Sequence, residues 1–186
     1  MMTPSKPTLT DLARQFGCDK FYRHSYMGTY DLLLGNRKVR RLLEVGIGYE
    51  GLMKEFVPFY VHGASLKMWS AYWPEAEIWA CDIREDALIN EGNIRSVVCD
   101  QSSPLALLDM IYCIGGCCDV IIDDGSHQFE HQMVSAATLL PYVCKGGVYI
   151  IEDTYPDKGL ELAKMFGGRV IVGSKTPDDT LVVIER

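Results

Sequence analysis

Short runs of apolar and β-branched residues recur along the chain, and most are followed by a turn signal and then a helical stretch. The first five runs are nearly continuous rather than alternating, which is typical of strands that helices cover on both faces. They lie at 41–47, 77–83, 94–100, 118–124 and 147–153. Helices are predicted between them at 64–72, 104–111, 127–140 and 157–166. This β–α alternation predicts an open, doubly wound sheet.

The last two apolar runs, 169–175 and 179–185, are separated only by Thr176, Pro177 and Asp178. A connection this short cannot cross over the sheet, so the pair must form an antiparallel hairpin. The predicted fold class is therefore α/β, with a Rossmann-like seven-stranded sheet that is mostly parallel and ends in a C-terminal antiparallel hairpin. This arrangement resembles the sheet of the class I S-adenosylmethionine (SAM) methyltransferases.

The 186 residues, of which 48% are hydrophobic, suit one compact domain. Residues 1–40 precede the sheet and are predicted to form a helix at 8–16 and a polar, aromatic loop at 19–28. We expect this segment to lie on the substrate side and residues 41–186 to form the cofactor-binding domain.

Charge and cysteine content narrow the function classes. The 18 basic and 25 acidic residues give a net charge of −7, and the scattered basic residues argue against a nucleic-acid partner. No apolar run approaches the roughly 18 residues of a membrane span, and the first residues lack a signal-peptide core, so we expect a cytoplasmic protein. The seven cysteines show neither a regular framework nor metal-ligand spacing and are predicted to be free thiols.

A glycine-rich turn, Gly46-x-Gly48-x-x-Gly51, directly follows the first predicted strand. Such a turn lets the backbone approach a nucleotide, and this spacing is often interpreted as a dinucleotide site. Two features count against that interpretation. The segment after Gly51 reaches Pro58 before any convincing helix, and Asp82 lies 31 residues past Gly51 rather than about 20.

Glu44 before the glycines is instead what the SAM-binding form of this turn looks like. Asp82, at the end of the second strand, is placed to accept both ribose hydroxyls, and Asp100 and Gln101 follow the third strand, where they would meet the adenine. The predicted cofactor-binding residues are therefore Glu44, Gly46, Gly48, Asp82, Asp100, Gln101 and Asp123. A dinucleotide site and a degenerate site without cofactor are the alternatives.

Four acids follow two strands that we expect to be neighbours, about 5 Å apart. Asp123 and Asp124 end the fourth strand, and Glu152 and Asp153 end the fifth. Carboxylates this close raise one another's pKa unless a cation neutralises them, and their oxygens suit Mg²⁺ or a similar divalent ion. The alternative is that Asp123, Asp124 or Ser126 only caps the following helix.

His127-x-x-Glu130-His131 also matches an inverted zinc-peptidase pattern. That pattern needs a further ligand, and the other histidines, His24 and His62, both lie upstream. His131 is therefore predicted to be a helix-face residue. His127, close to the acids, is the better candidate for a general base, because the ordinary pKa of histidine lies near neutrality.

Four blocks together resemble the metal-dependent sugar O-methyltransferases of macrolide biosynthesis: residues 42–48, 65–69, 123–127 (DDGSH) and 151–154 (IEDT). Residues 12–20 and 24–26 are also similar to the segment that precedes the sheet in that family. The resemblance implies metal ligation by Asp124, Glu152 and Asp153, with His127 as general base and Asp123 on the cofactor side. The sequence departs from the family in the longer loop at 52–62.

The resulting hypothesis is a SAM-dependent O-methyltransferase that uses Mg²⁺ to methylate a hydroxyl of a sugar or natural-product acceptor, as in antibiotic biosynthesis. The expected partner is this small molecule, and we expect neither a nucleic acid nor a membrane as partner. The sequence is compatible with a homo-oligomer. A non-catalytic SAM- or metal-binding scaffold and a nicotinamide-dependent oxidoreductase are the rival hypotheses.

Overall fold

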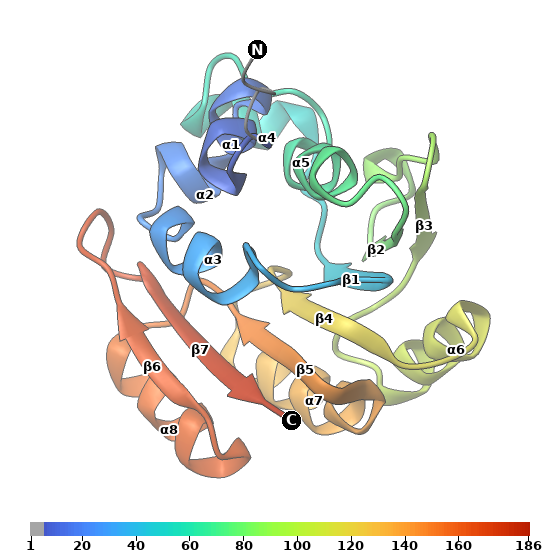
Figure 1. Cartoon of the computed structure of the whole chain (residues 1–186). Helices are drawn as coiled ribbons and strands as arrows, with labels where there is room; N and C mark the ends of the chain where they lie inside the picture. Colours follow the sequence, from blue (N-terminus) through green and yellow to red (C-terminus); the bar gives the residue numbers. More distant parts are fainter. Residues whose placement is uncertain (1–5) are drawn as a thin grey trace.

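The computed structural model describes residues 6–186, so the first five residues of the predicted N-terminal segment lie outside the described part. One mixed sheet of seven strands forms the centre of the molecule, in the order β3-β2-β1-β4-β5-β7-β6 (Figure 1). The strands are β1 (Arg41–Val45), β2 (Glu77–Asp82), β3 (Ile94–Val98), β4 (Cys118–Asp123), β5 (Val143–Ile151), β6 (Arg169–Val172) and β7 (Thr180–Glu185). β1 to β5 are parallel, and β7 is antiparallel to both β5 and β6. The predicted fold class is confirmed.

Helices cover both faces of the sheet (Figure 1). One face carries α1 (Leu9–Phe16), α2 (Asp19–Tyr22), α3 (Met27–Leu34), α4 (Glu50–Phe56) and α5 (Ala64–Tyr72). The other carries α6 (Pro104–Ile114), α7 (Phe129–Leu139) and α8 (Pro156–Phe166). Short 3₁₀ turns span Glu85–Ala87 and Leu140–Tyr142.

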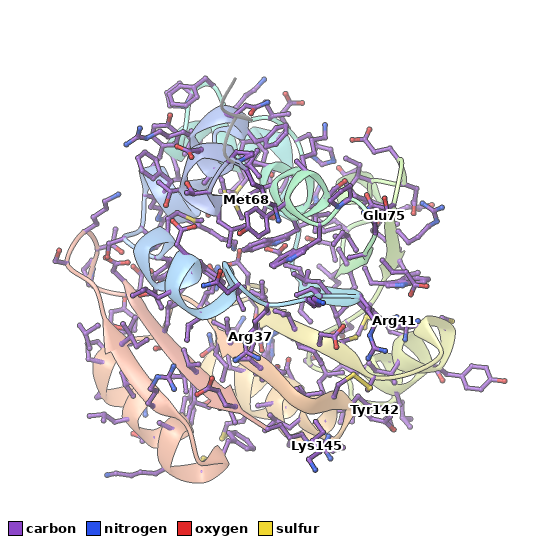
Figure 2. All side chains as sticks on the ribbon, in the orientation of Figure 1. Arg37, Arg41, Met68, Glu75, Tyr142 and Lys145 are labelled. Atoms are coloured by element: carbon purple, nitrogen blue, oxygen red, sulfur yellow. A yellow bond between two sulfur atoms is a disulfide. The ribbon has the colours of Figure 1, made fainter. Side chains whose placement is uncertain are left out.

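Successive strand residues point into two separate apolar layers. Leu42 packs into the layer beneath α1, α3 and α5, whereas Leu43 packs into the layer beneath α6, α7 and α8. In Figure 2 Met68 of α5 lies in the first layer, where it is fully buried, while Arg41 and Lys145 lie near the beginnings of β1 and β5. Burial on both faces explains why the strands are continuously apolar.

The order of the chain reverses at β1, which pairs with β2 on one side and with β4 on the other. The register aligns Val45 with Asp123, and Asp123 with Ile151, so these three strands end at the same level. Crevices at the carboxyl ends of strands beside such a switch point are where open α/β sheets bind ligands.

The N-terminal segment is more helical than predicted. The helix expected at 8–16 is present as α1, and the Thr8 side chain caps it in a box with Asp11. The loop expected at 19–28 is instead divided between α2 and the start of α3. Tyr26, Tyr30 and Leu34 recur at four-residue spacing and are all buried, so a continuous face of α3 packs on the core.

Two further boundaries differ from the predictions. A short helix, α4, occupies the start of the loop expected at 52–62, and none of its residues is buried, so it has no apolar stripe to reveal it. A Glu50–Lys54 ion pair links its first and last turns. β5 begins at Val143 rather than at 147, and its register with β4 shifts between Cys118 and Val120.

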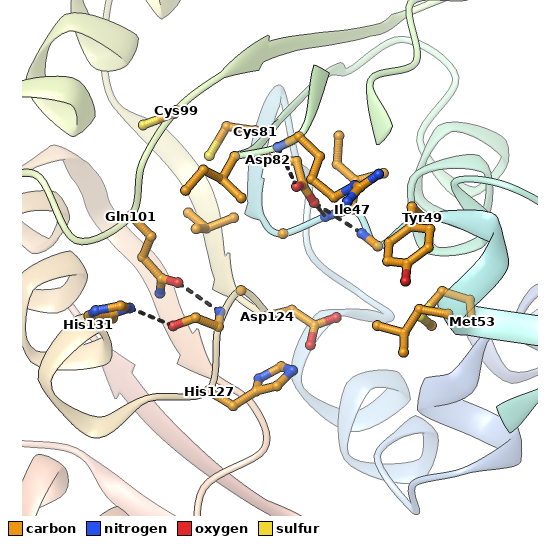
Figure 3. Close-up of a pocket in the computed structure, with 18 of the residues that line it drawn as sticks. Ile47, Tyr49, Met53, Cys81, Asp82, Cys99, Gln101, Asp124, His127 and His131 are labelled. Atoms are coloured by element: carbon orange, nitrogen blue, oxygen red, sulfur yellow. Dashed lines mark hydrogen bonds between the residues drawn. The ribbon is translucent and has the colours of Figure 1, made fainter. Parts of the chain in front are cut away.

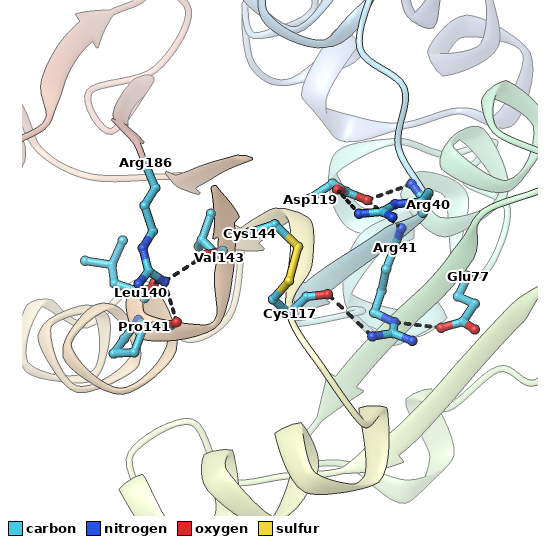
Figure 4. Close-up of a disulfide and its surroundings, with 10 residues drawn as sticks. All are labelled: Arg40, Arg41, Glu77, Cys117, Asp119, Leu140, Pro141, Val143, Cys144 and Arg186. Carbon is cyan, nitrogen blue, oxygen red and sulfur yellow. Dashed lines mark hydrogen bonds and ion pairs between the residues drawn. A yellow bond between two sulfur atoms is a disulfide. The ribbon is translucent and has the colours of Figure 1, made fainter. Parts of the chain in front are cut away.

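The expectation that all cysteines are free thiols is wrong. Cys117 and Cys144 form a disulfide that joins the beginnings of β4 and β5 (Figure 4). The two residues are 27 positions apart in the sequence, but strand pairing brings their Cα atoms to 5.2 Å, within the usual disulfide range. The free cysteines are Cys18, Cys81, Cys99, Cys113 and Cys118. Over residues 6–186, helices with the length and apolar character of a membrane span are absent.

Candidate active site

A cavity of about 410 Å³ opens at the carboxyl ends of β1, β2 and β4 (Figure 3). Its size falls within the range of small-molecule and cofactor sites. Five of the predicted cofactor-binding residues line it: Gly46, Gly48, Asp82, Asp100 and Gln101. Asp124 and His127, which were predicted for catalysis and metal binding, line the same cavity.

The glycine turn is a backbone arrangement that a side chain would disrupt. Gly46 has φ +94°, and a Cβ atom there would lie 2.0 Å from the carbonyl oxygen of Asp124. Gly48 also has a positive φ, of +73°. The turn therefore needs glycine both for its conformation and for the close approach of the β4 end.

Asp82 ties the glycine turn to the end of β2. Its Oδ2 accepts hydrogen bonds from the backbone N–H of Ile47 at 3.0 Å and of Gly48 at 3.2 Å, and its Oδ1 accepts one from Arg84 N–H at 2.9 Å. These bonds use both lone pairs of Oδ2 and one of Oδ1, so one acceptor site of the carboxylate remains for a ligand hydroxyl.

Gln101 connects the cavity wall to β4. Its Oε1 accepts from Ser126 N–H at 2.9 Å, and its Nε2 donates to Asp123 Oδ1. Asp123 itself is fully buried and does not line the cavity, and burial raises the pKa of its carboxyl to about 7. Asp100 is exposed at the rim and accepts hydrogen bonds from Ser102.

Glu44 also lies behind the cavity wall rather than on it. It is fully buried, and its Oε2 accepts from Trp69 Nε1 at 2.7 Å. Its Oε1 lies 3.2 Å from Lys20 Nζ. Of the seven predicted cofactor-binding residues, Glu44 and Asp123 thus support the wall while the other five face the cavity.

Asp124, His127 and Asp153 each offer one ligand atom within 4.8 Å of the others, a spacing that could hold a metal ion. His127 and Asp153 both have positive φ, of 57° and 53°. Backbone strain of this kind in non-glycine residues concentrates at functional sites. This group includes His127, which was predicted as a base, and does not include Glu152, which was predicted as a ligand.

Glu152 is buried directly behind this group. Tyr30 OH donates to its Oε1, and Lys20 Nζ donates to its Oε2 at 2.9 Å. Burial raises the pKa of Glu152, and the nearby charge of Asp124 adds to the effect. Burial likewise raises the pKa of Asp153, and Asp124 again contributes.

No family model matches this chain. The chain is 34% identical over 147 residues to the 8-demethyl-8-alpha-L-rhamnosyl tetracenomycin-C 2'-O-methyltransferase of Streptomyces olivaceus, which covers 79% of this chain and 38% of the relative. It is 35% identical over 158 residues to the mycinamicin VI 2''-O-methyltransferase of Micromonospora griseorubida, covering 81% of this chain and 37% of the relative.

Among solved structures, the MycE methyltransferase of the mycinamycin pathway in complex with Mg and SAH matches with a TM-score of 0.75 and 29% identity, over 97% of this chain and 55% of that one. The chain is a relative of these sugar O-methyltransferases. The predicted family resemblance is thereby confirmed. The chain spans less than half the length of the curated relatives it matches.

The structure weakens one argument against a dinucleotide site, namely that no helix directly follows the glycine turn. Because α4 begins at Glu50, a helix does follow the glycine turn. The 31-residue spacing from Gly51 to Asp82 still separates the turn from the dinucleotide pattern.

His131 lies in α7, as predicted, where its Nδ1 is 2.8 Å from Ser126 Oγ. The group of potential metal ligands formed by the described residues contains neither His131 nor Glu130. The structure therefore gives no support to the zinc-peptidase alternative within residues 6–186.

Several residues at the site were not predicted from the sequence to contact the acids. They come from the N-terminal segment and contact the acids at the strand ends: Lys20, His24, Tyr26 and Tyr30. The available signal was the similarity of residues 12–20 and 24–26 to the family, since nothing in the local pattern assigns these residues to the acids.

Proposed function

We propose that this chain transfers a methyl group from SAM to a hydroxyl of a sugar or natural-product acceptor, with the help of a divalent ion. The observation that carries the proposal is that Asp124 and His127 line the same cavity as the glycine turn and Asp82. A cofactor pocket and an acid–histidine group therefore share one chamber. The family relationship supports the same reaction, since the relatives are named O-methyltransferases.

The cavity fits the proposed cofactor. The glycine turn leaves room for a ligand to approach the backbone, and Asp82 Oδ1 keeps one acceptor site for a ribose hydroxyl. Asp100 and Gln101, at the far end of the cavity, are proposed to lie beside the adenine. Residues 41–186 would then form the cofactor-binding part, while Asp19 brings the N-terminal segment to the cavity wall.

The acids fit a divalent ion by their number and their charge. The ammonium group of Lys20 contacts three carboxylates, those of Glu44, Asp124 and Glu152. A fourth, that of Asp153, lies beside Asp124. Four carboxylates with one ammonium leave an excess of negative charge in a largely buried place, which a divalent cation offsets. We propose Asp124, Glu152 and Asp153 as its protein ligands, with water and the acceptor in the remaining positions.

A bound divalent ion would lower the pKa of an acceptor hydroxyl and fix its direction of attack. The chain's own residues have three tasks. The glycine turn and Asp82 orient the cofactor, and Asp124, Glu152 and Asp153 would hold the ion beside the acceptor. His127, 40% exposed at the cavity, accepts the hydroxyl proton at Nε2, and Asp153 Oδ2 at 3.8 Å stabilises the resulting positive charge.

Calorimetric titration with S-adenosylhomocysteine (SAH), SAM and NADH tests the proposal. We expect SAH and SAM to bind in the micromolar range and NADH to bind at least ~100-fold more weakly. Asp82→Asn should weaken SAH binding about 10-fold, because one charged acceptor is lost. Asp109→Asn, on the exposed surface of α6, is the matched control and should bind SAH as the wild type does.

Each result distinguishes the hypotheses. Tight binding of NADH with none of SAH would favour the oxidoreductase. SAH binding without methyl transfer to any glycosylated acceptor, including mycinamicin VI, would favour the non-catalytic scaffold. The cytoplasmic location and the absence of a nucleic-acid partner stay predictions from the sequence.

A further inference from the structure

Each acid of the proposed ion site is held by a side chain from one short stretch of the N-terminal segment, residues 20–30. Lys20 contacts Asp124 and Glu152, and Tyr30 contacts Glu152. We propose that Lys20 and Tyr30 are positioning residues, which fix the carboxylates of Asp124 and Glu152 in the orientation that binds the divalent ion. This inference rests on the proposed function, because it assumes that these acids are the ion's ligands.

Lys20 is the central group of this arrangement. Its side chain is fully buried, and its Nζ lies 2.9 Å from Glu152 Oε2 and 3.2 Å from Glu44 Oε1, and also contacts Asp124 Oδ2. Burying an ammonium group costs several kcal/mol unless carboxylates and hydrogen bonds compensate it. Two of the three Lys20 donors go to Asp124 and Glu152, which fixes one oxygen of each, while Glu44 Oε1 faces the ammonium charge without a hydrogen bond.

Tyr30 fixes the other oxygen of Glu152. The Tyr30 side chain is fully buried in α3, and its OH donates to Glu152 Oε1. Its ring packs on Trp69 at a centroid distance of 5.3 Å, and Trp69 Nε1 donates to Glu44 Oε2 at 2.7 Å. Both oxygens of Glu152 and both of Glu44 are therefore contacted by groups that packing holds rigid.

The third acid is held by the same stretch in a similar way. Tyr26 OH donates to Asp153 Oδ1 at 2.7 Å and accepts from Asp153 N–H at 3.2 Å. His24 Nε2 lies 3.3 Å from Asp153 Oδ2, and the His24 ring stacks on Tyr26. The stretch thus contacts every proposed ligand, whereas Gly48 and Asp82 of the cofactor pocket bond to each other instead.

Because residues 20–30 contact the proposed ion ligands and not Gly48 or Asp82, an experiment can distinguish a loss of ion positioning from a general disruption of the site. Partners that orient ligand carboxylates typically change metal affinity or activity 10–100-fold. If Lys20 only contributed charge, removing it would leave one more uncompensated negative charge, and the ion would bind more tightly. Positioning predicts the opposite sign.

The experiment measures Mn²⁺ and SAH binding by calorimetry on the purified chain and on three variants. Lys20→Met should bind Mn²⁺ ~10–100-fold more weakly, and Tyr30→Phe ~5–10-fold more weakly, with SAH affinity within about twofold of the wild type in both. Tyr72→Phe is the matched control, since Tyr72 OH donates to the Gly35 carbonyl at 2.7 Å and contacts none of the acids. Its Mn²⁺ affinity should equal that of the wild type.

Unchanged or tighter Mn²⁺ binding in Tyr30→Phe and Lys20→Met would overturn the inference. If Lys20→Met does not fold, Tyr30→Phe decides alone, because it removes one hydroxyl and keeps the packed ring. If the wild type and the variants bind SAH and Mn²⁺ equally well, the positioning role is rejected and the proposed function stands. A wild-type chain that binds no Mn²⁺ rejects both.

Discussion

Lys20 Nζ lies 2.9 Å from Glu152 Oε2, although 132 residues separate them in the sequence. Burial alone would lower the pKa of Lys20, but the charges of Asp124, Glu152 and Glu44 outweigh it and raise the pKa. Lys20 therefore stays protonated and acts as a fixed internal cation. The N-terminal segment is joined to the ends of β1, β4 and β5 through this one ammonium group.

The first prediction concerns stability. Lys20→Met should lower the free energy of unfolding by about 3–5 kcal/mol, because it leaves buried carboxylates unpaired. Adding Glu152→Gln should cost less than the sum of the two single changes, by about 1–3 kcal/mol. Chemical denaturation measures both.

Lys158→Met is the control for this cycle, since Lys158 pairs with Glu161 at 3.1 Å on the exposed surface of α8. It should leave the free energy of unfolding close to the wild-type value, because solvent screens an exposed ion pair. Strict additivity of Lys20→Met and Glu152→Gln would show that the two side chains do not interact.

A second prediction concerns the glycine turn. Gly46→Ala should destabilise the fold by about 4 kcal/mol or more and abolish SAH binding, because its Cβ would clash with the Asp124 carbonyl. Gly167 also has a positive φ, of +75°, but open space surrounds it, so Gly167→Ala is the control. Gly167→Ala should lower the free energy of unfolding by only about 1–2 kcal/mol, the cost of a left-handed conformation for alanine. Equal losses of thermal stability in the two variants would contradict the close-approach argument.

The third prediction concerns His127 and depends on the proposed function. His127→Ala should reduce the rate of methyl transfer by roughly 10²–10⁴, because the proton acceptor is lost, while SAH binding is retained. The decisive companion measurement is the Mn²⁺ affinity. An unchanged Mn²⁺ affinity in His127→Ala would support the role of His127 as the base. A fall of about 100-fold would instead make His127 an ion ligand together with Asp124 and Asp153. A nearly wild-type rate would mean that another group takes the proton.

A fourth prediction tests the disulfide. Cross-linking residues 27 positions apart should stabilise the fold by about 3–4 kcal/mol, so Cys117→Ser should lower the free energy of unfolding by that amount. A reducing agent should bring the wild type to the same value. The exposed, free Cys113 supplies the control, and Cys113→Ser should change stability by less than about 0.5 kcal/mol. Alkylation of all cysteines in the unreduced, unfolded chain would show that the bond does not form.

A fifth prediction uses the pH dependence of Asp179 in the β6–β7 connection. Burial alone would raise the pKa of Asp179, but hydrogen bonds from Ser25, Lys175 and Ser174 outweigh it and lower the pKa. A lowered folded-state pKa stabilises the fold above the unfolded-state pKa of about 4, and this contribution is lost as the pH falls through the folded-state pKa.

Asp179→Asn should therefore cost about 1–3 kcal/mol at pH 7, since its amide nitrogen cannot accept the backbone N–H bonds. The difference between wild type and variant should shrink below about pH 4. Denaturation curves from pH 3 to pH 7 measure it, and a difference that stays constant with pH would count against the assigned role of the charge.

The strands, the C-terminal hairpin and most of the cavity residues were predictable because they rest on local patterns. Continuous apolar runs predicted the buried parallel strands, and the three residues between the last two runs predicted the hairpin. Gly46, Asp82 and Asp124 were found because each ends or directly follows one of the parallel strands β1, β2 and β4.

The remaining features depend on contacts that no local pattern encodes. Lys20 meets Glu152 across 132 residues, so its role could not be inferred from spacing. α4 buries none of its residues and so carries no periodic signal. The Cys117–Cys144 bond joins the beginnings of β4 and β5, beside an irregularity in their register that no pattern in the sequence indicates.

The position of β7 in the sheet has a consequence for synthesis on the ribosome. β7 lies between β5 and β6 but follows both in the sequence, so β6 has no strand to pair with when it first emerges. Until Thr180–Glu185 has left the ribosome, β5 keeps an unpaired apolar edge, which is the kind of edge that promotes aggregation. The nascent chain therefore has to protect that edge, through a chaperone or through rapid completion, before the carboxyl ends of β4 and β5 can settle around Lys20.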